Sequence, residues 1–84
     1  MGSRDKLLRK LTSGHLRNVK FSELEQLLLD FGFVLARTNG SHHIFLHAEI
    51  EKIVNIQNIK GEAKPYQIKQ VLQLVEHYGL RIGE

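Results

Sequence analysis

The dipeptide Asn39-Gly40 separates two short apolar runs, residues 33–37 and 42–47, and this is the feature that most restricts the fold. A two-residue type I′ turn needs positive φ at both central positions, which Asn and Gly tolerate, so Asn-Gly is a strong signal for a β-hairpin. With these two residues at the turn, Thr38 pairs with Ser41 and Arg37 pairs with His42. The sequence therefore predicts an antiparallel hairpin with a defined register.

This register predicts which side chains share a face, because directly opposed residues of a hairpin lie on the same side. The face expected to cover the core ends in the pair Arg37 and His42 and carries four large apolar residues: Phe33, Leu35, Ile44 and Leu46. The face expected to be more open is mixed in character: Val34, Ala36, His43, Phe45 and His47.

Helical spacing appears on both sides of the hairpin. Apolar residues at Leu24, Leu27, Leu28 and Phe31 predict a helix over 23–31, with Ser22 and Glu25 as a capping box and Gly32 at its end. A second helix is predicted from Pro65, which suits a first helical position, to a stop at Gly79.

A third strand is predicted over 52–57, and a short amphipathic helix over 4–11. The order of elements predicts an α+β fold, α-β-β-β-α, with a three-stranded antiparallel sheet and an extra N-terminal helix.

Charge is unevenly distributed along the 84 residues. Residues 1–20 hold six of the twelve Lys and Arg against one acidic residue, a local charge of +5, whereas residues 21–84 carry −2. A basic N-terminal segment attached to a nearly neutral domain could be attracted to the phosphate backbone of a nucleic acid. The alternative interpretation is that these basic residues form only a solvated face of a helix. The absence of cysteine excludes a disulfide scaffold and a thiolate zinc site, and it fits a cytoplasmic protein.

The adjacent histidines at positions 42 and 43 are candidates for metal binding or for catalysis. Consecutive strand residues point to opposite faces, so His42 and His43 are not expected to share a metal ion. His43 and His47 share a face but lie about 13 Å apart, too far for joint ligation. His42 differs because it opens a strand beside Arg37, where a neutral imidazole could accept a proton and the arginine could attract a phosphate. A surface or packing histidine is the alternative.

Residues 21–80 resemble the HicA family of toxins that cleave messenger RNA. The resemblance is carried by Gly32-Phe33, by the run from Gly40 to Phe45, by His47, by Val54-Asn55-Ile56, and by Lys64-Pro65-Tyr66 before a helix that ends at Gly79. It implies a fold like a double-stranded-RNA-binding domain, a metal-independent ribonuclease without a cofactor whose key histidine matches His42, and an antitoxin partner of the HicB type. Gln57 stands where the family often has proline, and residues 1–20 extend beyond the family core.

We therefore expect a HicA-like RNA-binding and ribonuclease domain at 21–84, preceded by a basic N-terminal helical extension at 1–20. The expected function is that of a cytoplasmic toxin of a type II toxin–antitoxin system that cleaves messenger RNA and inhibits translation. His42 is the candidate catalytic residue, and the candidate RNA contacts are Arg37, Gly40, Ser41, Lys60 and Lys64. Two alternatives stay open: a non-catalytic RNA-binding module of the same fold, and a domain that docks a partner protein.

Overall fold

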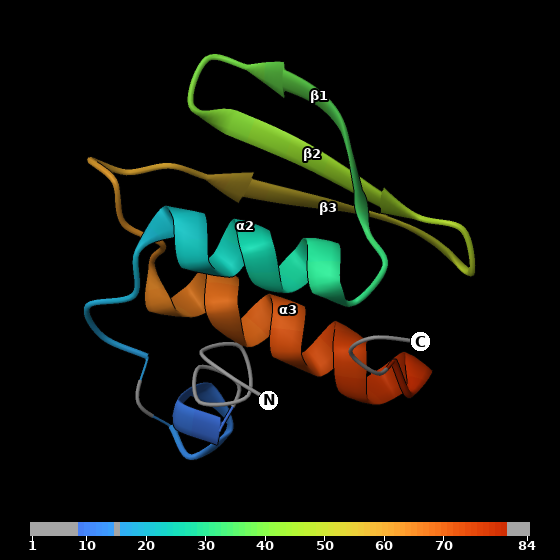
Figure 1. The fold of residues 1–84 in the computed structure, drawn as a ribbon, viewed down its shortest axis with the longest axis horizontal. Helices are drawn as coiled ribbons and strands as arrows, with labels where there is room; N and C mark the ends of the chain where they lie inside the picture. The colour runs from blue at the N-terminus through green and yellow to red at the C-terminus, as the bar shows by residue number, and fades with distance from the viewer. Residues whose placement is uncertain (1–8, 15, 81–84) are drawn as a thin grey trace.

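The computed structural model describes residues 9–14 and 16–80, and it has two long helices and a three-stranded sheet (Figure 1). The elements follow in the order α2 (Phe21–Asp30), β1 (Val34–Asn39), β2 (His42–His47), β3 (Ile50–Gln57) and α3 (Pro65–Tyr78). The sheet is antiparallel with the order β1-β2-β3, and α2 and α3 lie side by side on one of its faces. The predicted α+β fold, like that of a double-stranded-RNA-binding domain, is confirmed.

One hydrophobic core fills the space between the helices and the sheet. Phe45, Val54 and Ile56 enter it from the strands, and the helices contribute Leu24, Leu27, Leu28, Ile68 and Val71, all buried. Two buried residues from the N-terminal segment, Leu11 and Val19, belong to the same core. Residues 9–12 are helical, and the rest of the helix predicted over 4–11 lies outside the described residues. The segment before α2 therefore packs against the domain.

The ends of α2 follow from two local motifs. The helix begins at Phe21, two residues earlier than predicted, because the Glu23 carboxylate accepts a hydrogen bond from the backbone N–H of Lys20 at 2.9 Å; Ser22 and Glu25 do not form the capping box. The helix ends at Asp30, one residue before the predicted end, and the predicted stop signal is confirmed: Gly32 takes a φ of 98°, and the N–H of Phe33 donates to the carbonyl of Leu28 at 3.0 Å.

The later boundaries agree more closely with the sequence. β3 begins at Ile50, two residues before the predicted start, and it ends at Gln57 as expected. α3 runs from Pro65 to Tyr78 and is followed by Gly79 with a φ of 63°, so both predicted signals, the proline at the start and the glycine at the end, are confirmed. Within the described ranges, no helix is long and apolar enough to cross a membrane.

The register predicted for the hairpin is wrong. Asn39 pairs with His42, so the turn is centred on Gly40-Ser41, and Arg37 pairs with Ile44 instead of His42. Of these two central residues only Gly40 has positive φ, at 63°, as a type II′ turn requires at its first central position. A bulge between Leu35 and Arg37 then shifts the remaining pairs.

The predicted core face of the hairpin is also wrong. Phe45 is 0% exposed and faces the helices, whereas Leu35 and Leu46 are 43% and 40% exposed. Ile44, placed in the predicted core patch, is half-buried, and Phe33 is buried as predicted, from the turn before β1. The histidines on the helix side are half-buried and pack against aromatic rings: His43 contacts Phe21 with the two ring planes tilted by 57°, and His47 meets Phe33 edge to face.

Candidate functional site

His42 opens β2 directly after the turn, and its side chain is exposed on the face of the sheet opposite the helices. Its Nδ1 lies 3.3 Å from Oδ1 of Asn55, which belongs to the neighbouring strand β3. Nε2 has no hydrogen-bond partner among the residues that the structure describes. The ring therefore has one nitrogen held by the protein and one nitrogen open to solvent.

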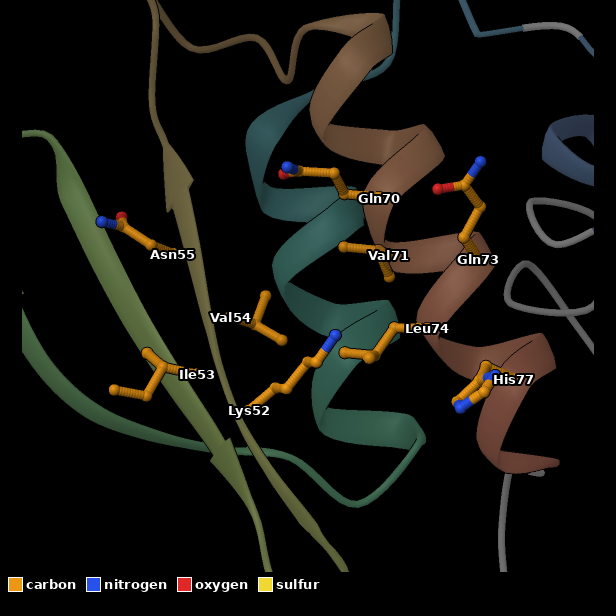
Figure 2. A pocket seen from close by; sticks show the side chains of 9 residues that line it. All are labelled: Lys52, Ile53, Val54, Asn55, Gln70, Val71, Gln73, Leu74 and His77. Atoms are coloured by element: carbon orange, nitrogen blue, oxygen red, sulfur yellow. The ribbon is translucent and has the colours of Figure 1, made fainter.

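The outer face of the sheet around His42 is defined by strand pairing. Ile44 is paired with Arg37 on β1 and with Asn55 on β3, and His42 is paired with Asn39 and Gln57. Because paired residues and their neighbours two positions away share a face, these side chains lie on the side of His42. Figure 2 shows Asn55 and Ile53 projecting from β3 away from α3.

Ser41 is fixed by its neighbours on the other strands. Its carbonyl accepts a hydrogen bond from the N–H of Asn58 at 2.8 Å and lies 3.2 Å from Nδ1 of His43. Its hydroxyl accepts a hydrogen bond from Nε2 of Gln57 at 3.2 Å. Since a carbonyl only accepts, Nδ1 of His43 carries the proton in that contact. Two hydrogen bonds thus hold the Ser41 backbone next to His42, and a third holds the Ser41 side chain.

The predicted basic contacts lie in two places. Arg37 is exposed and lies on the outer face, two pairs away from His42. Lys60 is exposed, with a φ of 53°, in the loop between β3 and α3, and Lys64 is the N-cap residue of α3.

The loop that carries Lys60 is attached to both the hairpin and α2. Asn58 contacts Ser41, and the carbonyl of Gly61 accepts a hydrogen bond from the N–H of Phe21 at 2.9 Å. The hairpin tip, this loop and the first turns of both helices consequently lie at one end of the molecule (Figure 1). Unpaired amides at helix N-termini add positive potential there.

Two residues of this region were not found from the sequence. Lys20, which belongs to the basic extension at 1–20, is the N-cap residue of α2. Its backbone forms an isolated β-bridge with Glu62 of the loop, so it lies at the same end of the molecule as Lys64 (Figure 1). Asn55 lies in the predicted third strand, and the sequence pattern gives it no functional role. No spacing rule could have found it, because the register between β2 and β3 depends on the connection after His47 and on the irregularity between Phe45 and His47.

A groove of about 450 Å³ lies between β3 and α3, away from His42 (Figure 2). Val54, Val71 and Leu74 make its apolar part, and its polar lining includes residues of both elements: Lys52, Gln70, Gln73 and His77. Ile53 and Asn55 also border the groove, but their side chains point away from α3, toward the face of His42 (Figure 2). The groove is therefore separate from the face that carries His42.

Comparison with known proteins gave one match. The family described as HicA toxin of bacterial toxin-antitoxin matches residues 21–76, which is more than half of the 84-residue chain. The matched range contains α2, the whole sheet and nearly all of α3. No curated protein and no solved structure matched the chain.

Proposed function

Because the chain belongs to the HicA family of bacterial toxin–antitoxin toxins, we propose that it is a metal-independent ribonuclease that cleaves messenger RNA and so inhibits translation. The system is of type II, in which the antitoxin is a protein, and the site of action is the cytoplasm, where messenger RNA is translated. The observation that carries the proposal is the position of His42, exposed on the open face of the sheet with Nε2 unbonded among the described residues.

In the proposed reaction, Nε2 of His42 takes the proton of a ribose 2′-hydroxyl. The 2′-oxygen attacks the adjacent phosphorus, the bond from phosphorus to the 5′-oxygen breaks, and the 5′-oxygen takes a proton from water. The hydroxide that remains takes the proton from His42, which returns to its neutral form. The products are a 2′,3′-cyclic phosphate and a free 5′-hydroxyl. General-base catalysis contributes about 10²–10⁴-fold, or ~3–5 kcal/mol, so positioning and charge stabilisation must supply the rest of the acceleration.

Positive groups around the hairpin tip are proposed to supply that charge stabilisation. Arg37 shares the face of His42, and the tip itself offers Gly40 and Ser41 for close contact with the RNA backbone. Lys60 and Lys64 lie toward the same end, where the first turn of α3 adds amide donors suited to phosphate. The basic extension at 1–20 is proposed to add contacts to phosphates outside the cleavage site.

The partner is proposed to be an antitoxin of the HicB type that covers the outer face of the sheet. This face also carries exposed apolar side chains farther along the strands from His42: Val34 and Ile53 are 60% and 64% exposed and Leu46 is 40% exposed. Exposed apolar side chains gathered on one face are typical of protein-binding surfaces, and RNA phosphates would gain little from them. One bound protein could thus cover both the apolar patch and His42.

The test is RNA cleavage by His42→Ala, measured in the presence of a chelator. His77→Ala is the matched control, since His77 is also an exposed histidine but lies in the last turn of α3. We expect His42→Ala to lose cleavage while it still folds and binds RNA, and His77→Ala to cleave at the parental rate. If His42→Ala cleaves at the parental rate, or if the chelator stops parental cleavage, the mechanism is wrong. Binding of intact RNA without cleavage by the parental chain would favour the non-catalytic RNA-binding module.

A further inference from the structure

The hydrogen bond between His42 and Asn55 assigns a role to a residue with no part in the proposed reaction so far. Asn55 is paired with Ile44, so it lies two residues along β3 from Gln57, the partner of His42, a diagonal distance that side chains can span. Its Oδ1 lies 3.3 Å from Nδ1 of His42. We propose that Asn55 is a positioning residue, which holds the proton of His42 on Nδ1 and so leaves Nε2 as the nitrogen that accepts a proton from RNA.

The assignment follows from what an amide oxygen can do. Oδ1 has lone pairs and no hydrogen, so the imidazole nitrogen that faces it must carry the proton. A neutral imidazole has one N–H and one lone pair, and a proton on Nδ1 leaves the lone pair on Nε2. Free histidine in water favours the other tautomer, with the proton on Nε2. The contact with Asn55 therefore selects the form that could act as a base through its solvent-exposed nitrogen.

His42 differs from the other two histidines of the sheet in its exposure and in its hydrogen bonds. In His47, Nδ1 accepts a hydrogen bond from the N–H of Glu49 at 3.0 Å and Nε2 lies 3.2 Å from the carbonyl of Phe31, so both nitrogens are used. His43 contacts Ser41 on the helix side of the sheet. Of the three, His42 alone is exposed on the outer face with a described partner on one nitrogen only.

Asn55 lies in a strand of the sheet and not in a loop. β3 pairs with the central strand β2, and two pairs from Asn55 toward the turn, Gln57 donates to the Ser41 hydroxyl. Side chains on paired strands hold catalytic groups more accurately than side chains on loops. The sheet therefore fixes the backbone positions of His42 and Asn55 before RNA binds.

The inference rests on the proposed function, but its first test does not need RNA. Nitrogen and carbon chemical shifts of the imidazole, measured by NMR above the pH at which His42 is charged, report which nitrogen carries the proton. We expect the Nδ1–H form in the parental chain and a shift toward the Nε2–H form in Asn55→Ala. Asn39→Ala is the matched control, because Asn39 is the amide paired with His42 on the other side, and no side-chain hydrogen bond joins the two. It should leave the tautomer unchanged.

The second test is kinetic. Asn55→Ala should lower kcat on the order of 10- to 100-fold, the cost of losing a ring-orienting partner at metal-bound histidines, with KM nearly unchanged. Asn55→Asp keeps the acceptor and should keep the tautomer, but its negative charge favours the charged ring, so the pH midpoint of cleavage should rise. A role in folding alone would move neither the tautomer nor this midpoint.

The outcomes separate this inference from the proposed function. An Nε2–H tautomer in the parental chain, or an unchanged tautomer in folded Asn55→Ala, would overturn the role of Asn55 whether or not RNA is cleaved. Parental cleavage by His42→Ala would overturn the proposed function, and the tautomer measurement would still decide whether Asn55 orients the ring.

Discussion

Replacing each of the two adjacent histidines by alanine should separate activity from stability, because the strand turns their side chains to opposite faces. His42 is exposed, and its loss removes one hydrogen bond and leaves Asn55 accessible to water. We expect His42→Ala to change the free energy of unfolding by less than about 0.5 kcal/mol, as for surface substitutions in general, while it abolishes cleavage.

His43→Ala should have the reverse effect. It removes the hydrogen bond to the Ser41 carbonyl, a net contribution of about 0.5–1.5 kcal/mol, and the contact with Phe21 at a ring distance of 4.6 Å, about the same again. The Ser41 carbonyl keeps the N–H of Asn58 at 2.8 Å, so no acceptor is left unpaired. The total is about 1–3 kcal/mol, against about 4–13 kcal/mol for the stability of a domain of this size.

Urea unfolding followed by far-ultraviolet circular dichroism measures both free energies, since the chain has no tryptophan. Cleavage is then compared at a temperature at which both variants are folded, and His43→Ala should retain substantial activity. The reasoning is refuted if His42→Ala is destabilised as much as His43→Ala, or if folded His43→Ala is as inactive as His42→Ala.

Two further predictions concern the partner and the basic extension. Ile53→Asn removes an exposed apolar side chain without adding a charge to the face of His42, and it should weaken binding of the antitoxin at least tenfold without lowering RNA cleavage; equal affinity for both forms in calorimetry would contradict the proposed surface. The double variant Arg9→Ala and Lys10→Ala removes two exposed bases and keeps the buried Leu11, so the slope of log affinity against log salt for single-stranded RNA should become shallower by about 1.4. An unchanged slope would show that these bases do not contact phosphates.

Sequence patterns were sufficient where a local motif decides the structure. Gly32 and Gly79 end helices because positive φ is easily adopted by glycine, and Pro65 starts one because its fixed φ suits the first turn. The opposite orientation of His42 and His43 also follows from the period of a strand. These features depend on a few neighbouring residues and needed no tertiary information.

The core face of the hairpin depended on tertiary packing and could not be found in this way. Counting large apolar residues favoured the face with Leu35, Ile44 and Leu46, but the helices cover the face with Phe45. The cost of burying His43 and His47 beneath the helices is met by partners 2 to 16 residues away in the sequence, such as Ser41 and Phe31. The bulge after Leu35 breaks the alternation on which the prediction relied.

The proposed site also explains why an amide, and not a carboxylate, is suited to position 55. A carboxylate would orient the ring through Nδ1 equally well, and Asp fills that role in catalytic triads, where it also stabilises the imidazolium that forms during the reaction. In a site for RNA, however, a negative charge at position 55 would repel the phosphate across the imidazole ring, and at a separation of about 8 Å this is unfavourable by ~0.5 kcal/mol in bulk water and ~2 kcal/mol at an effective dielectric constant of 20. It would also favour the protonated ring, which cannot act as a base. Asn55 provides the acceptor without either effect, so the Asn55→Asp variant should orient His42 correctly and still bind RNA more weakly than the parental chain.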